Sequence, residues 1–168
     1  MTSRVAELSE IQKTEISELF GEYVNLDKRE RHYYNHDMGA LPPLVKKVIG
    51  NTDPAAVVKI RTEEDAVKLL EFANRHRIPV VPRAGASSGY GGVIATKGGI
   101  VADVTSLNKI RSIDPEEQKA VVQSGIIWEK LERKLKENGL SVRAIPSSAP
   151  SSTVGGWLAQ SGAGYGSY

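Results

Sequence analysis

Two stretches of this chain combine glycine with hydroxyl residues in a pattern that suits the binding of an anion. The first is PRAGASSGYGG, residues 82–92, and the second is PSSAPSSTVGGWLAQSGAG, residues 146–164. Residues without bulky side chains let the backbone turn sharply and approach a ligand closely, and consecutive N–H groups in such a turn form a concave anion site. Arg83 adds a permanent positive charge. These features favour a phosphate or pyrophosphate ligand, although a solvated glycine loop is the commoner interpretation of such residue types alone.

The established phosphate-binding fingerprints do not describe these stretches. Neither contains the P-loop pattern G-x-x-x-x-G-K-[ST] or the dinucleotide pattern G-x-G-x-x-G. The residues GAGYG at 162–166 come close, but the preceding WLAQS is typical of a helix, whereas the dinucleotide fingerprint follows a strand. Gly155 and Gly156 lie at a predicted helix start, where free N–H groups and the helix dipole favour an anion. The two glycine-rich stretches thus lie between predicted elements of the core. Two such loops indicate a long cofactor that is bound at two places.

The elements that must position these stretches follow from hydrophobic periodicity and capping residues. Residues 4–24 are predicted as a helix, and residues 25–50 as an irregular segment laid over a surface. Further helices are predicted after the N-cap Thr62, at residues 127–138, and after Thr153. The first strand–helix–strand unit predicts a parallel pair with a right-handed crossover, and the predicted fold class is α+β with mixed strands. The predicted strands are residues 55–60, 78–82, 98–104 and 120–125, and residues 140–146 are predicted as a fifth strand or an extended segment.

Composition narrows the class of protein. The 168 residues are 40% apolar and 25% charged, as in soluble globular proteins, and 22 basic and 20 acidic residues give a net charge of +2. This balance makes nucleic acid a poor prediction for a partner, and the sequence contains no apolar run of about 18 residues that could span a membrane. The lack of Cys excludes disulfides and Cys-ligated metals. We expect a cytoplasmic protein, with peripheral membrane association left open.

The histidines do not predict a catalytic or metal site. His32 and His36 are four residues apart and would share one face of a helix. However, the YYN between them supplies no metal ligand and no carboxylate completes a ligand set. We interpret the two as a surface pair, predict no metal, and assign no catalytic residue.

Both glycine-rich stretches have counterparts in a known family. IPVVPRAGASSGYGGVIATKGGIVADVTSLNKI, residues 78–110, and PSSAPSSTVGGWLAQSGAGYGSY, residues 146–168, are similar to the two signatures of the PCMH-type, or vanillyl-alcohol-oxidase-like, FAD-binding domain. The sequence most resembles the branch with the glycolate oxidase D subunit, D-lactate dehydrogenase and alkyldihydroxyacetonephosphate synthase. The resemblance extends over about residues 30–168. It implies the first lobe of the PCMH-type fold plus the beginning of the second, with mixed parallel and antiparallel strands and flanking helices.

The resemblance implies roles for residues of both stretches. The backbone of the first would wrap the FAD pyrophosphate, and the second would lie along the ribityl chain and the isoalloxazine. Ser87 stands where members with covalently attached flavin often carry His, so FAD is expected to bind non-covalently. Asp103 and Asn108 fit the family's strand and turn pattern, and we assign them structural roles. The implied cofactor-binding residues are Pro82, Arg83, Ala84, Gly85, Ala86, Ser87, Ser88, Pro146, Ser147, Ser152, Thr153, Gly155, Gly156 and Gly164.

The resemblance also implies a function and a domain plan. Residues 1–50 are expected to form a helical and irregular segment, and residues 51–168 a FAD-binding domain truncated at its C-terminus. The implied function is the FAD-binding module of a flavin-dependent oxidoreductase that oxidises a 2-hydroxy acid, of the glycolate or D-lactate type, or a related alcohol. The chain alone is expected to be inactive. The alternatives are a fragment of a flavin-dependent transferase of the alkyldihydroxyacetonephosphate synthase type, and a non-catalytic partial domain completed by another chain. An electron-transfer subunit and self-association are further candidate interactions.

Overall fold

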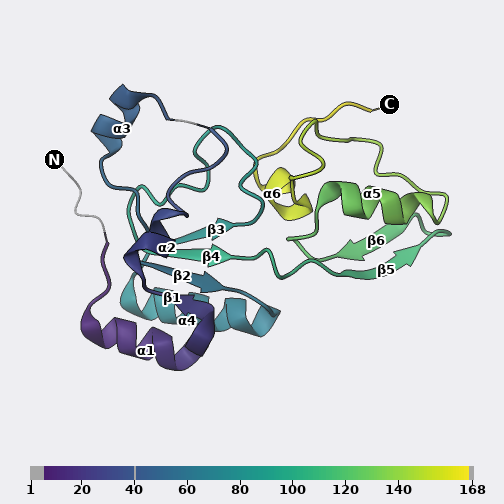
Figure 1. The fold of residues 1–168 in the computed structure, drawn as a ribbon. Helices are drawn as coiled ribbons and strands as arrows, with labels where there is room; N and C mark the ends of the chain where they lie inside the picture. Colours follow the sequence, from purple (N-terminus) through teal and green to yellow (C-terminus); the bar gives the residue numbers. More distant parts are fainter. Residues whose placement is uncertain (1–5, 40, 167–168) are drawn as a thin grey trace. The chain divides into compact units, whose positions relative to one another are not determined.

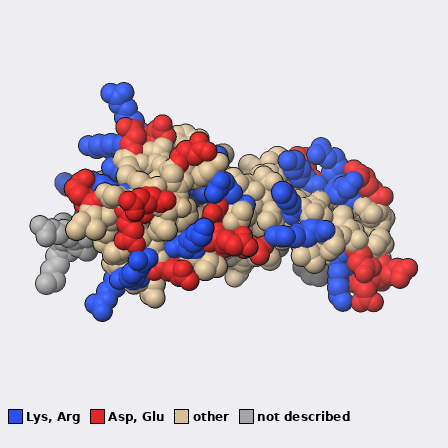
Figure 2. All heavy atoms as spheres, turned by 90° about the horizontal axis from the view of Figure 1, so that it is seen from below, with Lys and Arg blue, Asp and Glu red and all other residues tan. Residues whose placement is uncertain are grey.

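The chain divides into two compact units (Figure 1), and the computed structural model describes residues 6–39 and 41–166. Within these ranges, no helix has the length and apolar composition that crossing a bilayer requires. On the face shown in Figure 2, Lys and Arg side chains are mixed with Asp and Glu, as the near-neutral composition predicts. Unit 1 consists of residues 1–83 and 88–103, and unit 2 of residues 84–87 and 104–168.

Unit 1 is built on a four-stranded sheet with the strand order β1-β2-β4-β3. The edge strand β1 is antiparallel to β2, whereas β2 and β3 are both parallel to β4. All residues of β4 are buried, and this central place suits its continuous apolar run IVA. The strands are β1 (Val24–Asn25), β2 (Ala56–Lys59), β3 (Val80–Arg83) and β4 (Ile100–Asp103).

The strand predictions for unit 1 are confirmed in position and corrected in pairing. The structure contains strands within or overlapping the predicted ranges 55–60, 78–82 and 98–104. However, β2 and β3 do not form the predicted pair, because β4 lies between them and pairs with both. β4, which follows the first glycine-rich stretch, therefore lies next to β2. Sequence order alone would have placed β3 there.

The helix predicted at residues 4–24 is shorter than expected among the described residues, which do not include residues 4 and 5. α1 (Glu10–Phe20) begins after Ser9, whose hydroxyl accepts the Gln12 N–H at 3.3 Å, while the Gln12 side chain accepts the Ser9 N–H at 2.9 Å. This reciprocal capping box fixes the start of the helix. Gly21, with a positive φ of 55°, ends it. The last part of the predicted helix is instead η1 (Gly21–Tyr23) and the start of β1. The segment predicted as irregular, residues 25–50, contains the end of β1, α2 (Lys28–His32) and α3 (Pro43–Ile49).

α4 (Glu63–His76) connects β2 to β3 and begins at the predicted cap. The Thr62 hydroxyl accepts the Asp65 N–H at 3.1 Å, which satisfies one of the free donors of the first turn. α1 and α4 lie on the same side of the sheet in Figure 1. The core of unit 1 therefore draws on the sheet and these two helices, and its largest fully buried side chains are Ile16, Val58, Ile60, Leu69, Phe72, Ile100 and Val101.

Unit 2 contains an antiparallel hairpin and two helices. Its elements are β5 (Ile110–Asp114), β6 (Lys119–Val122), α5 (Trp128–Lys136) and α6 (Val154–Ala159), which confirms the predicted strand near 120–125 and both predicted helices. β5 was not predicted. Residues 140–146, predicted as a strand or an extended segment, form no strand, because the left-handed Arg143 (φ 65°) interrupts the extended run and only the isolated bridge Ile145–Tyr165 forms. The core of this unit is Ile126, Trp128, Leu131, Leu135, Ala149 and Val154.

Candidate functional site

The first glycine-rich stretch leaves the sheet at the carboxyl ends of its parallel strands. Lys59, Asp103 and Arg83 share the last register position of β2, β4 and β3. Ligands of parallel sheets typically bind outside these ends. Along residues 84–89, none of the backbone N–H groups donates a hydrogen bond to any described residue. Ala86 is left-handed (φ 48°), so the chain turns sharply within this row of free donors. The loop is therefore equipped to bind an anion through its backbone.

The Arg83 side chain contacts the backbone of the protein itself. Its guanidinium is buried, lies 5.2 Å from the ring centroid of Tyr34, and donates to the carbonyl oxygens of Tyr34 (3.4 Å) and His36 (2.5 Å). Burial lowers the pKa of Arg83, although the nearby Tyr34 and Asp103 act in the opposite direction. An arginine stays charged under such conditions. The described contacts thus commit this charge to the backbone of residues 34–36.

The half-buried Tyr34 and the buried Asp103 form a polar pair beside Arg83. The Tyr34 hydroxyl donates to Asp103 Oδ2 at 3.1 Å. Burial, followed by the charge and the hydrogen bond of Asp103, raises the pKa of Tyr34 to about 12. The hydroxyl is therefore neutral and a donor at physiological pH. The structural roles expected for Asp103 and Asn108 agree with these contacts, since Asn108 Nδ2 donates to the Thr105 carbonyl at 3.1 Å.

The two glycine-rich stretches meet at Gly85, within unit 2. A Cβ atom at this position would lie 2.3 Å from the Ser151 carbonyl oxygen and 3.5 Å from Thr153 Cγ2. The backbone of Gly85 is not left-handed, unlike that of Ala86. The glycine is therefore required here by the close approach of a second backbone, and the sharp turn is made by its neighbour.

The start of α6 differs from the prediction of free amides. The N–H of Val154 donates to the Ile126 carbonyl at 3.0 Å, that of Gly155 to the Ser124 carbonyl at 2.8 Å, and that of Gly156 to Thr153 Oγ1 at 3.3 Å. These donors are already paired, so the helix start offers no free N–H group at its first three residues. Thr153 is nevertheless the predicted N-cap.

Small size has a packing role at the other glycines of the second stretch. A Cβ on Gly155 would lie 2.5 Å from the Ser124 Cβ, and a Cβ on Gly164 would lie 2.7 Å from the Ile145 carbonyl oxygen. Among the other proposed cofactor residues of this stretch, Pro146 and Ser152 are buried and Ser147 is exposed. The contact of each with a cofactor stays a prediction.

Sequence reasoning missed the residues that support the loop from unit 1. Tyr34 and Asp37 lie in a segment predicted to be irregular, yet the Asp37 side chain is only 5% exposed. Its carboxylate accepts the N–H groups of Gly39 at 2.9 Å and Gly91 at 2.7 Å. The local sequence Asp-Met-Gly indicates a turn, but nothing local indicates the contact with Gly91. His32 and His36 are exposed, as expected of a surface pair.

Fold and site together define a domain that can bind a phosphate-containing cofactor through backbone donors at the carboxyl edge of a parallel sheet. Residues 54–168 match the FAD binding domain family, and the chain therefore belongs to that family. The family is one of domains that bind FAD.

Two relatives and one solved structure show the branch of the family. The chain is 34% identical over 106 residues to the mitochondrial D-lactate dehydrogenase [cytochrome] of Arabidopsis thaliana, covering 63% of this chain and 18% of that protein. It is also 34% identical over 111 residues to the glycolate oxidase subunit GlcD of Bacillus subtilis, covering 66% and 24%. A structure of alkyldihydroxyacetonephosphate synthase has a TM-score of 0.79 at 25% identity, over 98% of this chain and 32% of that one.

These likenesses confirm the resemblance to the PCMH-type FAD-binding domain and the α+β fold with mixed strands. The chain spans about a fifth of the length of the curated relatives that it matches.

Proposed function

We propose that this chain holds FAD non-covalently as the cofactor-binding part of an oxidoreductase that oxidises a 2-hydroxy acid or a related alcohol. The observation that carries the proposal is the row of free N–H groups along residues 84–89 at the carboxyl edge of the sheet. The substrate class is supported by the names of the D-lactate dehydrogenase and glycolate oxidase relatives. FAD supplies the redox chemistry when bound, as the acceptor of the substrate's α-hydrogen with its electron pair.

The residues of this chain would bind and orient the cofactor. Free amides of the 84–89 loop would donate to the pyrophosphate oxygens. The packing of Gly85 on Ser151 would hold the second stretch beside the loop within unit 2. Ser87 carries a hydroxyl and no imidazole, so it offers no nitrogen for attachment to the flavin. The domain plan, with a segment at 1–50 and the FAD-binding domain at 51–168, is part of this proposal.

The binding step is tested by titrating the purified chain with FAD and following the flavin fluorescence. We expect one FAD per chain, and we expect inorganic pyrophosphate to compete because it would occupy the same amides. A chain that is folded by circular dichroism but binds no FAD would contradict the proposal. Binding that pyrophosphate does not weaken would remove the assignment of the pyrophosphate to the 84–89 loop.

The mode of attachment is tested by acid precipitation of the FAD-loaded protein. All of the flavin should appear in the supernatant, since no covalent bond retains it. Flavin that stays in the washed pellet would show that a residue other than Ser87 forms a bond.

Because the chain alone is expected to be inactive, the reaction class is tested on the FAD-loaded product of the full-length gene. Glycolate and D-lactate are offered to it with a dye as electron acceptor. Reduction of the dye by one of them supports the oxidoreductase assignment. Bound FAD without dye reduction by either acid would instead favour a transferase or a non-catalytic domain, because neither passes electrons from a hydroxy acid to an acceptor.

A further inference from the structure

We infer that residues 34–39, named here the 34–39 segment, fix for ligand binding the two ends of the glycine-rich loop that lie in unit 1, residue 83 and residues 88–91, and that Asp37 is the positioning residue. The segment lies outside residues 54–168, the part of the chain that matches the FAD binding domain family. The inference deepens the proposed function and rests on it for the identity of the ligand. The contacts themselves are independent of that identity.

The first contact is with the residue at which the loop begins. Arg83, at the end of β3, is 8% exposed and donates to the carbonyl oxygens of Tyr34 and His36. A hydrogen bond from a charged donor is stronger than one between neutral groups, and here the charged donor is shared by two carbonyl groups of one turn. The start of the loop is thereby fixed to the 34–39 segment.

The second contact is with the end of the loop. One Asp37 oxygen accepts the Gly91 N–H at 2.7 Å, and the other accepts the Gly39 N–H at 2.9 Å. The Met38 N–H donates to the Ser88 carbonyl at 3.1 Å. A single carboxylate therefore joins the segment to the loop while it also fixes the turn of its own segment.

The backbones approach closely where these bonds form. A Cβ on Gly39 would lie 2.4 Å from the Gly89 carbonyl oxygen, so no larger residue fits at position 39 without displacing the loop. This packing adds a steric contact to the two backbone hydrogen bonds that join the segment to the loop.

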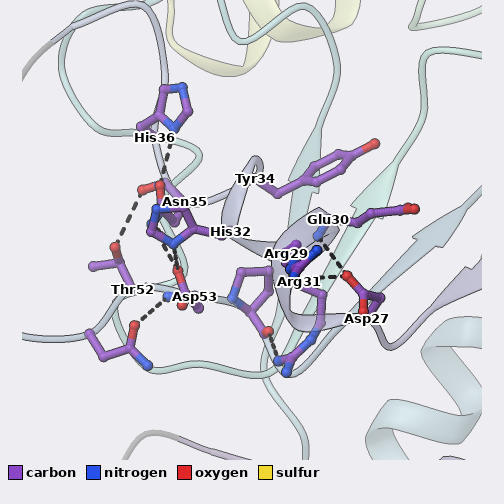
Figure 3. Close-up of polar contacts among 12 residues, drawn as sticks. Asp27, Arg29, Glu30, Arg31, His32, Tyr34, Asn35, His36, Thr52 and Asp53 are labelled. Carbon is purple, nitrogen blue, oxygen red and sulfur yellow. Dashed lines mark hydrogen bonds and ion pairs between the residues drawn. The ribbon is translucent and has the colours of Figure 1, made fainter.

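The 34–39 segment is itself held in place by polar contacts on its other side (Figure 3). Asp53, just before β2, accepts from Asn35 Nδ2 at 2.8 Å and lies 2.9 Å from His32 Nδ1. The Thr52 hydroxyl donates to the Asn35 carbonyl at 3.3 Å. Tyr34 points the other way in Figure 3, over the strands, where it donates to Asp103. The segment thus connects the loop to β4 and to the residues that precede β2.

A loop with both ends fixed loses less conformational freedom when it binds a ligand than a loop that is free. Asp37 carries a negative charge, which by itself would disfavour an anionic ligand. The charge is partly offset by two amide donors and by the charge of Arg83. We therefore expect the loss of its hydrogen bonds to outweigh the removal of its charge.

The test uses two substitutions at one position. In Asp37→Asn, the amide nitrogen cannot accept an N–H, so one of the two bonds is lost together with the charge. In Asp37→Glu, the charge is retained, but the carboxylate is displaced by one methylene. Both variants should bind FAD about tenfold more weakly than the parent chain. Asp114→Asn is the matched control, because Asp114 also accepts two backbone amides, those of Glu116 and Glu117 at 3.0 Å, at the β5–β6 turn.

A measurement without ligand separates this inference from the proposed function. Amide hydrogen exchange of Gly91 in the ligand-free chain should be about tenfold faster in Asp37→Asn than in the parent or in Asp114→Asn. If the parent binds no FAD, the proposed function fails, while faster Gly91 exchange still supports the positioning role. Unchanged Gly91 exchange, or equal FAD affinity of Asp37→Asn and the parent, would overturn the role of Asp37.

A second variant keeps the inference testable if Asp37→Asn does not fold. Gly39→Ala retains the Asp37 carboxylate and adds a Cβ that must displace Gly89. It should weaken FAD binding at least as much as Asp37→Glu. An unaltered affinity in folded Gly39→Ala would show that the segment does not position the loop.

Discussion

Replacing Gly85 by Ala tests whether the two glycine-rich stretches must touch. The new Cβ would lie 2.3 Å from the Ser151 carbonyl oxygen, and Cβ atoms essentially never come within 3.0 Å of another heavy atom. The two backbones must therefore separate by about 0.7 Å. The neighbouring atom belongs to the backbone and cannot rotate away, so we expect a cost of about 1–3 kcal/mol, typical of an overpacked site.

The same separation should affect cofactor binding, because it displaces the amides on either side of Gly85. About 1.4 kcal/mol corresponds to a factor of ten, so the affinity for FAD should fall by about tenfold or more. The cost arises from the contact and not from backbone strain, since Gly85 is not left-handed.

The matched control is Gly92→Ala, which makes the same chemical change in the same stretch. No atom lies within 4 Å of a Cβ built on Gly92, and its stability should stay within about 0.5 kcal/mol of the parent. Urea denaturation and FAD titration of both variants are the assays. The reasoning would be refuted if Gly85→Ala and Gly92→Ala had the same stability and the same FAD affinity.

Three further predictions concern folding and pH. Thr62→Ala should destabilise the chain by about 1 kcal/mol in urea denaturation, since the N-cap bond to Asp65 is lost; Thr62→Ser, which keeps the hydroxyl, should cost clearly less, and equal losses would contradict the capping role. The pKa of Tyr34 is about 12 in the folded state, against the ordinary 10.0. The contribution of the neutral Tyr34 to the free energy of unfolding should therefore be complete below pH 10 and should be lost as the pH rises from 10 to 12. In urea denaturation at these pH values, the loss should be smaller in Tyr34→Phe. Burial acts to raise the pKa of Asp65, but hydrogen bonds from Arg61 lower it below the ordinary 3.8. The stabilisation by the ionised Asp65 should therefore be present above about pH 4 and lost on acidification. The free energy of unfolding of Asp65→Asn should fall less steeply in acid than that of the parent, and an equal fall would argue against the Asp65–Arg61 hydrogen bonds.

The parts of the fold that the sequence predicts correctly are those with local causes. β4 is a continuous apolar run, α4 follows a Thr with acidic residues in its first turn, and Thr153 caps α6. β5 was missed because its pattern IRSID is only partly apolar and most of the hairpin is exposed. The turn that forms the hairpin did carry an indication, since Asp114 precedes a proline and caps two amides of the turn.

The candidate site divides in the same way. The glycine and hydroxyl composition identified both stretches, and the structure brings them together at Gly85. The contacts of these stretches could not be predicted from composition. The start of α6 has no free N–H at its first three residues, and the Arg83 side chain binds backbone carbonyls. The role of Asp37 could not be predicted, because its partner Gly91 is 54 residues away in the sequence and no local pattern reports such a contact.

The way the chain passes between its two units has a consequence for any attempt to separate them. Residues 84–87 belong to unit 2, although unit 1 contains the residues on both sides of them. A gene split after residue 103 would leave Gly85 on the first fragment and its contact Ser151 on the second. Neither unit can therefore be expressed alone with all of its parts. The design suited to such a chain is fragment complementation, in which Gly85 and Ser151 come together only when the two pieces are mixed.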